Sequence, residues 1–274
     1  MADVAARTAR LLGRPAASAV RLQGGDLSQV WRIDLGAGQS VVAKTGTPAA
    51  AEAAMLRAIA NAGAPAPAVL ALAGDLLVME DLGSDEGLQT GPAGGAWGDL
   101  GRVLAQLHAA IADGYGWAED HAFGPVRIEN AALADWPEFW AVRRLLPCCH
   151  ALSADLARRV ERLAARLPAL LPRHPPAALL HGDLWTGNIV ARGGRVTGLI
   201  DPACHHGHAE VDLAMLTLFA RPAPAFWESY GQAEAAGAAR RPLYQLWPAL
   251  VHLRLFGAAY RNLVERCLTA AEAM

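Results

Sequence analysis

Three side chains with oxygen ligands are spaced so that a short hairpin would bring them together. Asp183 and Asn188 lie five positions apart in a loop, and a strand is expected directly after Asn188. A second apolar run, residues 196–200, ends at Asp201, and Gly193-Gly194 between the two runs is typical of a hairpin turn. Asn188 and Asp201 would then lie at neighbouring strand ends. Phosphoryl transfer requires such a set, because that chemistry consists mostly of positioning groups and neutralising charge with metal ions.

A single Asp in a glycine-rich turn is more often a turn residue, because its side chain can bond to its own backbone. The joint pattern is more specific. Residues 181–188 read H-G-D-L-W-T-G-N and residues 200–203 read I-D-P-A, which resembles the catalytic segment of aminoglycoside phosphotransferases. With Trp185 and the later G-H-A-E-V-D-L-A-M at residues 207–215, the pattern resembles the fructosamine kinase (ketosamine 3-kinase) family more closely.

This resemblance implies an ATP-dependent kinase that phosphorylates a ketosamine, a fructosamine or ribulosamine, at its 3-hydroxyl and serves in protein deglycation. It implies that Asp183 is the catalytic base and that Asn188 and Asp201 bind Mg²⁺. Trp185 could stack on the acceptor sugar, because it lies two residues after the base and has a flat face. His205 stands where the family often has an aromatic residue, so it is a candidate substrate contact.

Two further residues are expected to support the site. Asp212 lies inside an almost wholly apolar run, residues 211–219, where an unpaired carboxylate would be too costly. We therefore expect Asp212 to hold the base of the catalytic loop through backbone N–H groups, and we expect His181 to have a structural place in that loop. His108, beside an apolar helical stripe, is expected to be a packing residue.

The first third of the chain carries the predicted ATP site. A glycine-bearing turn at residues 24–28 lies between two predicted strands, where backbone N–H groups can approach a phosphate, although an ordinary hairpin turn fits these glycines equally well. Residues 76–83 resemble a kinase hinge, in which an apolar wall is followed by backbone polar groups that suit adenine. The predicted ATP-binding residues are Gly24, Gly25, Ser28, Lys44, Glu52, Met79, Glu80 and Leu82.

Lys44 and Glu52 are predicted to form a pair. Lys44 ends a β-branched strand that resembles the V-A-I-K strand of kinases, where the ammonium contacts phosphates, although a lone Lys at a strand end is usually solvated. Thr47 could cap, and Pro48 could open, a helix that carries Glu52. The carboxylate of Glu52 would then hold the ammonium of Lys44 in place.

Composition excludes several classes of partner. The 274 residues carry 24 Lys and Arg against 26 Asp and Glu, so no basic field favours nucleic acid or an anionic membrane surface. The N-terminus lacks a long apolar core, and the 4 Cys include no C-x-x-C pair. We therefore expect a cytoplasmic enzyme, with a monomer favoured, whose partner is a small-molecule or glycated-protein ketosamine.

The predicted fold is α+β, bilobal and protein-kinase-like. Residues 1–83 are expected to form an antiparallel sheet lobe with a helix, and residues 84–98, rich in glycine, a hinge or linker. Residues 99–274 are expected to form a mainly helical lobe that holds the catalytic and substrate-binding residues. The amphipathic stripe at residues 100–111 is typical of its first helix.

Two rival functions remain open. A kinase of the aminoglycoside or choline class would use the same catalytic loop, and a nucleotide-binding pseudokinase could share the fold. The sequence disfavours the pseudokinase, since all the predicted catalytic and ATP-binding side chains are present. Residues 202–274 contain six acidic and six basic residues, so they offer no carboxylate surplus for a polycationic aminoglycoside.

Overall fold

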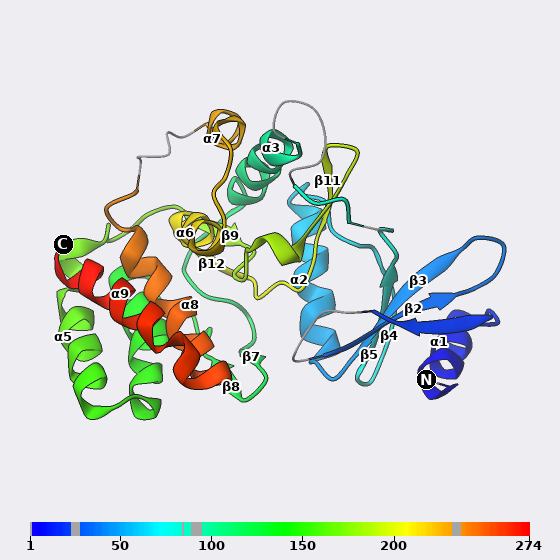
Figure 1. The fold of residues 1–274 in the computed structure, drawn as a ribbon, viewed down its shortest axis with the longest axis horizontal. Coiled ribbons are helices and arrows are strands. Elements are labelled where there is room, and N and C mark those ends of the chain that lie inside the picture. Colours follow the sequence, from blue (N-terminus) through cyan, green and yellow to red (C-terminus); the bar gives the residue numbers. More distant parts are fainter. Residues whose placement is uncertain (1, 23–27, 84, 89–94, 232–236) are drawn as a thin grey trace.

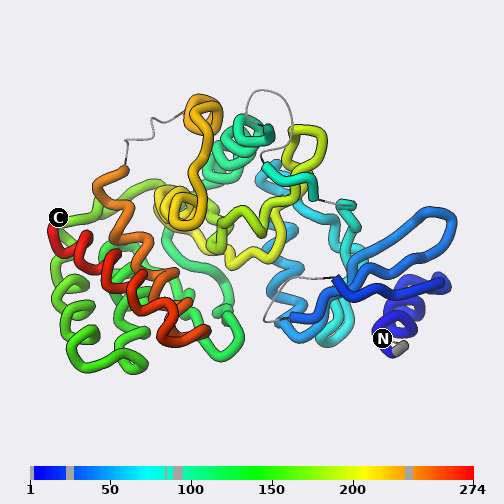
Figure 2. Tube along the Cα trace, in the orientation of Figure 1, coloured from blue at the N-terminus to red at the C-terminus, as the bar shows by residue number. Residues whose placement is uncertain are grey.

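A computed structural model describes residues 2–22, 28–83, 85–88, 95–231 and 237–274. It has a sheet-rich N-terminal part and a larger helical part that lie side by side along the long axis of the molecule (Figure 1 and Figure 2). The bilobal α+β arrangement predicted from the sequence is confirmed. The predicted ATP contacts Gly24 and Gly25 lie outside the described residues.

The first lobe is built on a five-stranded antiparallel sheet with the strand order β1-β2-β3-β5-β4. Its elements are α1 (Ala2–Leu12), β1 (Ser18–Arg21), β2 (Gln29–Asp34), β3 (Ser40–Thr45), α2 (Ala49–Asn61), β4 (Val69–Ala73) and β5 (Leu76–Glu80). Because side chains alternate along a strand, Val41 and Ala43 of β3 pack in the cluster that contains Val4 of α1. Val42 packs in the opposite cluster, against α2. The same alternation turns Lys44 toward α2.

The start of α2 differs from the prediction in one detail. Pro48 occupies the N-cap position and no side chain caps the helix. The Thr47 hydroxyl instead donates to Glu52 Oε2 at 3.3 Å. The predicted Thr47 cap is therefore wrong, because this hydroxyl bonds the carboxylate that the helix presents to Lys44.

Helices dominate the second lobe. They are α3 (Trp97–His108), α4 (Trp136–Trp140), α5 (Ala154–Leu170), α6 (Glu210–Phe219), α7 (Pro224–Tyr230), α8 (Arg241–Phe256) and α9 (Arg261–Glu272). A π-helical turn (Ala141–Leu145) and a 3-10 helix (Leu146–Ala151) continue α4, and a second 3-10 helix (Gly257–Tyr260) separates α8 from α9. Gly101 lets α3 approach α7 closely, since a Cβ there would lie 2.3 Å from the carbonyl oxygen of Phe226.

Three small sheets place the loops that carry polar side chains. They are β12-β9-β6 (His205–Gly207, Ala177–Leu180, Ile111–Ala112), β7-β8 (His121–Phe123, Val126–Ile128) and β10-β11 (Ile189–Arg192, Arg195–Leu199). The hairpin expected after Asn188 is therefore confirmed, and Ile189 pairs with Leu199. A 3-10 turn, Thr186–Asn188, connects the loop after β9 to β10.

The segment between the lobes contacts the second lobe where it is described. The Glu86 N–H donates to the Ala191 carbonyl at 2.8 Å, and the Ala191 N–H donates to Asp85 Oδ1 at 2.9 Å. This segment thus adds to the edge of the β10-β11 hairpin before α3 begins at Trp97.

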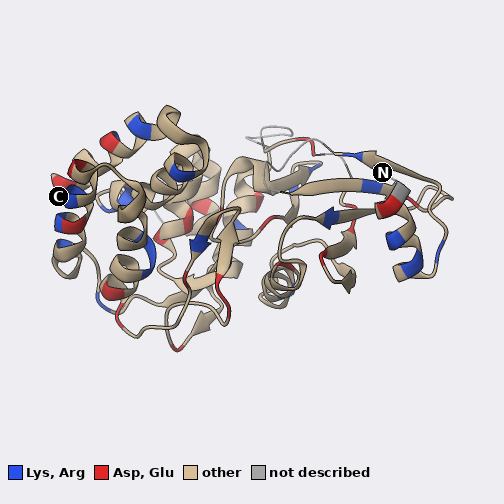
Figure 3. Ribbon diagram, turned by 90° about the horizontal axis from the view of Figure 1, so that it is seen from below, with Lys and Arg blue, Asp and Glu red and all other residues tan. Residues whose placement is uncertain are grey.

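The described helices include none with the length and apolar character of a membrane span. Acidic and basic residues are interspersed over both lobes (Figure 3), in keeping with the balanced composition.

Candidate active site

Asp212 of α6 anchors the backbone of the loop after β9 by hydrogen bonds. Its carboxylate accepts the N–H of His181 at 2.7 Å and the N–H of Gly182 at 2.9 Å, and it lies 3.2 Å from His108 Nε2. Although burial favours the protonated form, the hydrogen bonds from His108 and from the Gly182 N–H lower the pKa of Asp212. A fully buried carboxylate therefore stays ionised and anchors the loop. The backbone N–H partners that the sequence predicted for Asp212 are present, and His108 is buried, as expected of a packing residue.

His181 connects this loop to the strand end that precedes Asp201. Its Nε2 lies 3.0 Å from the Ile200 carbonyl, which can only accept, so Nε2 carries the proton. Its Nδ1 then accepts the N–H of Asp183 at 3.3 Å. Burial lowers the pKa of His181, which favours the neutral ring, and its two hydrogen bonds select the tautomer. The ring positions backbone atoms on both sides of the site.

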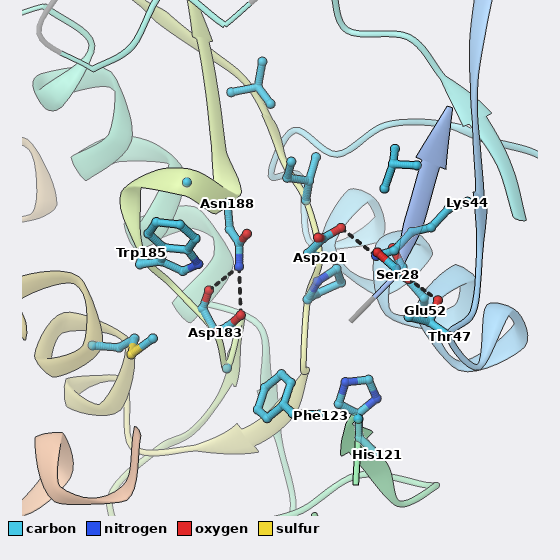
Figure 4. Close-up of a pocket in the computed structure, with 18 of the residues that line it drawn as sticks. Ser28, Lys44, Thr47, Glu52, His121, Phe123, Asp183, Trp185, Asn188 and Asp201 are labelled. Atoms are coloured by element: carbon cyan, nitrogen blue, oxygen red, sulfur yellow. Dashed lines mark hydrogen bonds and ion pairs between the residues drawn. The ribbon is translucent and has the colours of Figure 1, made fainter. Parts of the chain in front are cut away.

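The Asp183 carboxylate is half-buried and has a neutral hydrogen-bond partner. Asn188 Nδ2 donates to both the carbonyl oxygen and Oδ2 of Asp183, each at 2.9 Å (Figure 4). Burial raises the pKa of Asp183 to about 7, and the bond from Asn188 limits the rise. A carboxylate poised near neutrality suits general base chemistry. Because Asn188 uses its amino group here, its Oδ1 remains to face a cation.

Asp201 faces Lys44 across the space between the lobes. Lys44 Nζ lies 2.7 Å from Asp201 Oδ1 and 2.8 Å from Glu52 Oε1, and the Lys44 side chain is only 4% exposed (Figure 4). Burial opposes the charged ammonium, but the charges of Glu52 and Asp201 outweigh it and raise the pKa of Lys44. Asp201 adopts a φ of 53°, uncommon for a residue with a side chain. The pairing of Lys44 with Glu52 was predicted, and that with Asp201 was not.

One cleft of about 1160 Å³ between the lobes is lined by Lys44, Glu52, Asp183, Asn188 and Asp201. Ser28, Met79 and Leu82 line its N-terminal side. Glu80 also borders it, but its N–H is already donated to the Ala68 carbonyl at 2.9 Å. The N–H of Glu80 is therefore not free to bind a nucleotide.

Trp185 and His205, the two predicted acceptor contacts, lie in different surroundings. Trp185 is 40% exposed, lines the cleft and covers Gly187, where a Cβ would lie 2.3 Å from the indole. His205 is 1% exposed and stacks on Phe139 with ring centroids 6.1 Å apart. Because β12 pairs with β9, its alternation turns His205 into the core and His206 outward onto Trp117. The prediction of His205 as a substrate contact is therefore wrong.

The β7-β8 hairpin adds two residues that the sequence analysis missed. His121 and Phe123 line the cleft from the C-terminal side, and Figure 4 shows them between Asp183 and the residues around Lys44. Burial and the Lys44 charge lower the pKa of His121 to about 4, and its buried Nδ1 has no hydrogen-bond partner among the described residues. The alternating pattern around Gly124-Pro125 is the signal that could have indicated this hairpin.

Comparison with known proteins identifies the family. The family model described as fructosamine kinase matches residues 1–273. A protein of Thermus thermophilus named "Probable ketoamine kinase" is 35% identical over 265 residues, which cover 92% of this chain and 94% of that protein. A protein of Arabidopsis thaliana named "Protein-ribulosamine 3-kinase, chloroplastic" is 32% identical over 202 residues, covering 69% of this chain and 59% of that protein.

Solved structures agree with this family. The crystal structure of a candidate fructosamine-3-kinase from Thermobifida fusca has a TM-score of 0.89 and 33% identity, and all of each chain is covered. An aminoglycoside phosphotransferase solved with ADP and hygromycin B has a TM-score of 0.66 at 20% identity, covering 98% of each chain, which shows a shared fold alone. With a family match over nearly the whole sequence, this chain is an ATP-dependent phosphotransferase that belongs to the fructosamine kinase family.

Proposed function

We propose that the enzyme transfers the γ-phosphoryl group of ATP to the 3-hydroxyl of a fructosamine or ribulosamine, free or attached to a protein, and so serves in deglycation. The observation that carries the proposal is the convergence of Asp183, Asn188, Asp201 and Lys44 on one interlobe cleft. The names of the relatives, a ketoamine kinase and a ribulosamine 3-kinase, support the class of acceptor.

Asp183 is the proposed general base. It takes the proton of the acceptor hydroxyl as the oxygen attacks phosphorus, and its pKa of about 7 leaves a large share ionised at neutral pH. Asn188 holds the carboxylate through Nδ2 at 2.9 Å, which orients one oxygen and leaves the other for the substrate. Proximity of the acceptor oxygen to the γ-phosphorus, from which ADP departs, supplies much of the remaining rate.

Lys44, Glu52 and the hinge are the proposed nucleotide contacts. The ammonium of Lys44, held by Glu52 at 2.8 Å, would bind phosphate oxygens. The Glu80 carbonyl and Leu82 backbone would meet the adenine edge against Met79. We extend this proposal to the turn at residues 24–28, including Ser28, as the cover of the phosphates. Residues 84–98 would join the nucleotide lobe, residues 1–83, to the catalytic lobe, residues 99–274.

Asn188 Oδ1 and the Asp201 carboxylate are the proposed Mg²⁺ ligands. One amide oxygen and one carboxylate fit this cation, which prefers oxygen ligands and keeps positions for phosphate and water. No group of three or more His, Cys, Asp or Glu side chains among the described residues could hold a metal. Tight metal binding should therefore require the nucleotide. The chemistry that Mg²⁺ supplies when bound is neutralisation of phosphate charge.

Product analysis tests the acceptor. Purified enzyme, ATP and Mg²⁺ would be incubated with fructosamine, ribulosamine, an aminoglycoside and choline, and the products examined by phosphorus NMR. We expect a single sugar 3-phosphate from the ketosamines and no turnover when excess chelator is present. Trp185→Ala should raise the KM for the ketosamine about tenfold or more, with little effect on the KM for ATP. Efficient phosphorylation of the aminoglycoside or choline, with ketosamines untouched, would overturn the assignment.

A further inference from the structure

The cleft has a second part that phosphoryl transfer does not use. Beyond Pro202, the described residues that line it come from α6, α8 and the 3-10 helix after α8, and none of them is Asp, Glu, Lys or Arg. Met215 and Phe219 lie on α6, His252 and Phe256 on α8, and Tyr260 on the 3-10 helix. We call this surface the C-terminal wall. It contrasts with the side of the cleft that carries Lys44, Glu52 and Asp201.

Four rings of the C-terminal wall form a contact cluster. The ring centroid of His252 lies 5.4 Å from Phe219, 5.6 Å from Phe256 and 4.9 Å from Tyr260. Phe219 and Phe256 nevertheless remain 43% and 41% exposed. Large apolar side chains that line a pocket and remain exposed to solvent favour the binding of an apolar ligand.

His252 does not add a charge to this wall. Its Nδ1 lies 2.7 Å from the Pro248 carbonyl, which can only accept, so Nδ1 carries the proton. Burial lowers the pKa of His252, which keeps the ring neutral at pH 7. Nε2 is then a hydrogen-bond acceptor that can face an N–H of a ligand. A polycation finds no carboxylate on the described part of this wall.

The cleft is larger than one ligand needs, and the C-terminal wall is continuous with the part that holds Asp183. The cleft volume of about 1160 Å³ exceeds the range of about 300–1,000 Å³ that is common for pockets filled by one drug-sized ligand. Asp183 and Trp185 line the same cleft as the C-terminal wall. A sugar whose hydroxyl meets Asp183 can therefore extend a substituent along the wall.

We propose that the C-terminal wall is the subsite for the group carried by the ketosamine nitrogen, and that it selects an uncharged alkyl or aromatic group. This inference rests on the proposed function, because it assumes a ketosamine acceptor. The methylene stem of a glycated lysine side chain belongs to the selected class, and an amine substituent with a second ammonium does not. Burial of apolar surface against Phe219, Phe256 and Tyr260 provides the selectivity.

A homologous series of substrates tests the subsite. Fructose derivatives of methylamine, propylamine, butylamine and hexylamine would be compared with those of benzylamine and 1,6-diaminohexane. We expect kcat/KM to rise about threefold to fourfold for each methylene that the wall covers. The terminal ammonium should remove most of the gain of the hexyl chain. The KM for ATP should stay constant along the series.

Two substitutions and one control locate the effect. Phe256→Ser and Phe219→Ser, both at half-exposed positions, should each flatten the dependence on chain length, with the largest loss in kcat/KM for the hexylamine derivative and the smallest for the methylamine derivative. Leu146→Ser is the matched control, because Leu146 is 36% exposed and does not line the cleft. It should keep the full dependence.

The outcomes separate the subsite from the function. Equal kcat/KM for the methyl and hexyl derivatives, or a dependence that both Phe variants retain, would overturn the subsite and leave the ketosamine assignment intact. If no member of the series were phosphorylated, the proposed function itself would fail.

Discussion

The two halves of the catalytic centre hold their carboxylates by different means. Asp201 meets a cation, Lys44, at 2.7 Å, and this contact joins residues 157 positions apart on opposite sides of the cleft. Asp183 meets only the neutral amide of Asn188, within its own loop. Burial raises the pKa of Asp183 to about 7, and the hydrogen bond from Asn188 limits the rise. In the proposed function, Lys44 and Asp201 form a charge-binding half of the site, and Asp183 forms a proton-accepting half.

Asp183→Asn gives the strongest test of this division. The variant should lose roughly 10²–10⁴-fold in kcat, because an amide cannot accept the hydroxyl proton. ATP affinity, measured by calorimetry with a non-hydrolysable analogue, should change little. A variant that retained half of its turnover would place the base elsewhere and erase the distinction between the halves.

Asp212→Ala tests the support beneath the proton-accepting half. It leaves the N–H groups of His181 and Gly182 buried without the acceptor that lies within 2.9 Å of each. We expect a loss of about 3 kcal/mol in the free energy of unfolding, measured by urea denaturation. His108→Phe, which removes only the imidazole partner, should cost less. Equal losses for the two variants would show that the backbone contacts of Asp212 add nothing to the free energy of unfolding.

The pH dependence sharpens the comparison. The pKa of Asp183 is raised in the folded state, so the folded protein binds more protons than the unfolded chain between about pH 4 and pH 7. This carboxylate therefore contributes stability at low pH that is lost as pH rises through 7. Asp183→Asn should gain stability over wild type by about 2 kcal/mol more at pH 8 than at pH 5. In the wild type, kcat/KM should fall as pH drops below 7.

Equal differences between variant and wild type at the two pH values would indicate that Asp183 titrates normally. The measurement is thermal unfolding in matched buffers. Glu228→Gln on the exposed part of α7 is a suitable control, because it removes a carboxylate outside the cleft.

The smallest expected difference is between two variants of the charge-binding half, Lys44→Met and the double variant that also carries Glu52→Ala. Lys44→Met should lower kcat/KM for ATP strongly, and Glu52→Ala about tenfold. The double variant should lie within about 0.5 kcal/mol of Lys44→Met alone, because the pair acts as one unit. A double-mutant cycle from steady-state kinetics measures this difference. Fully additive losses would show that Glu52 does not act through Lys44.

Local patterns predicted much of this site. The Gly193-Gly194 turn implied that Asn188 and Asp201 lie at neighbouring strand ends, and the structure pairs Ile189 with Leu199 between them. The contact of Lys44 with Glu52 was predictable because only a strand end and a helix start separate them. Short loops restrict the relative placement of neighbouring elements, so spacing along the chain carries this information.

Contacts between distant elements were decided by tertiary structure. The Lys44–Asp201 pair needs the packing of one lobe on the other, and the Asp212 carboxylate found His108, which lies 104 positions away. His205 shows most clearly what the sequence could not predict. Successive side chains of a strand point to opposite faces, and only the pairing of β12 with β9 decides which face is buried. Residue type cannot select between two faces of one short strand. Its neighbours in the folded chain do.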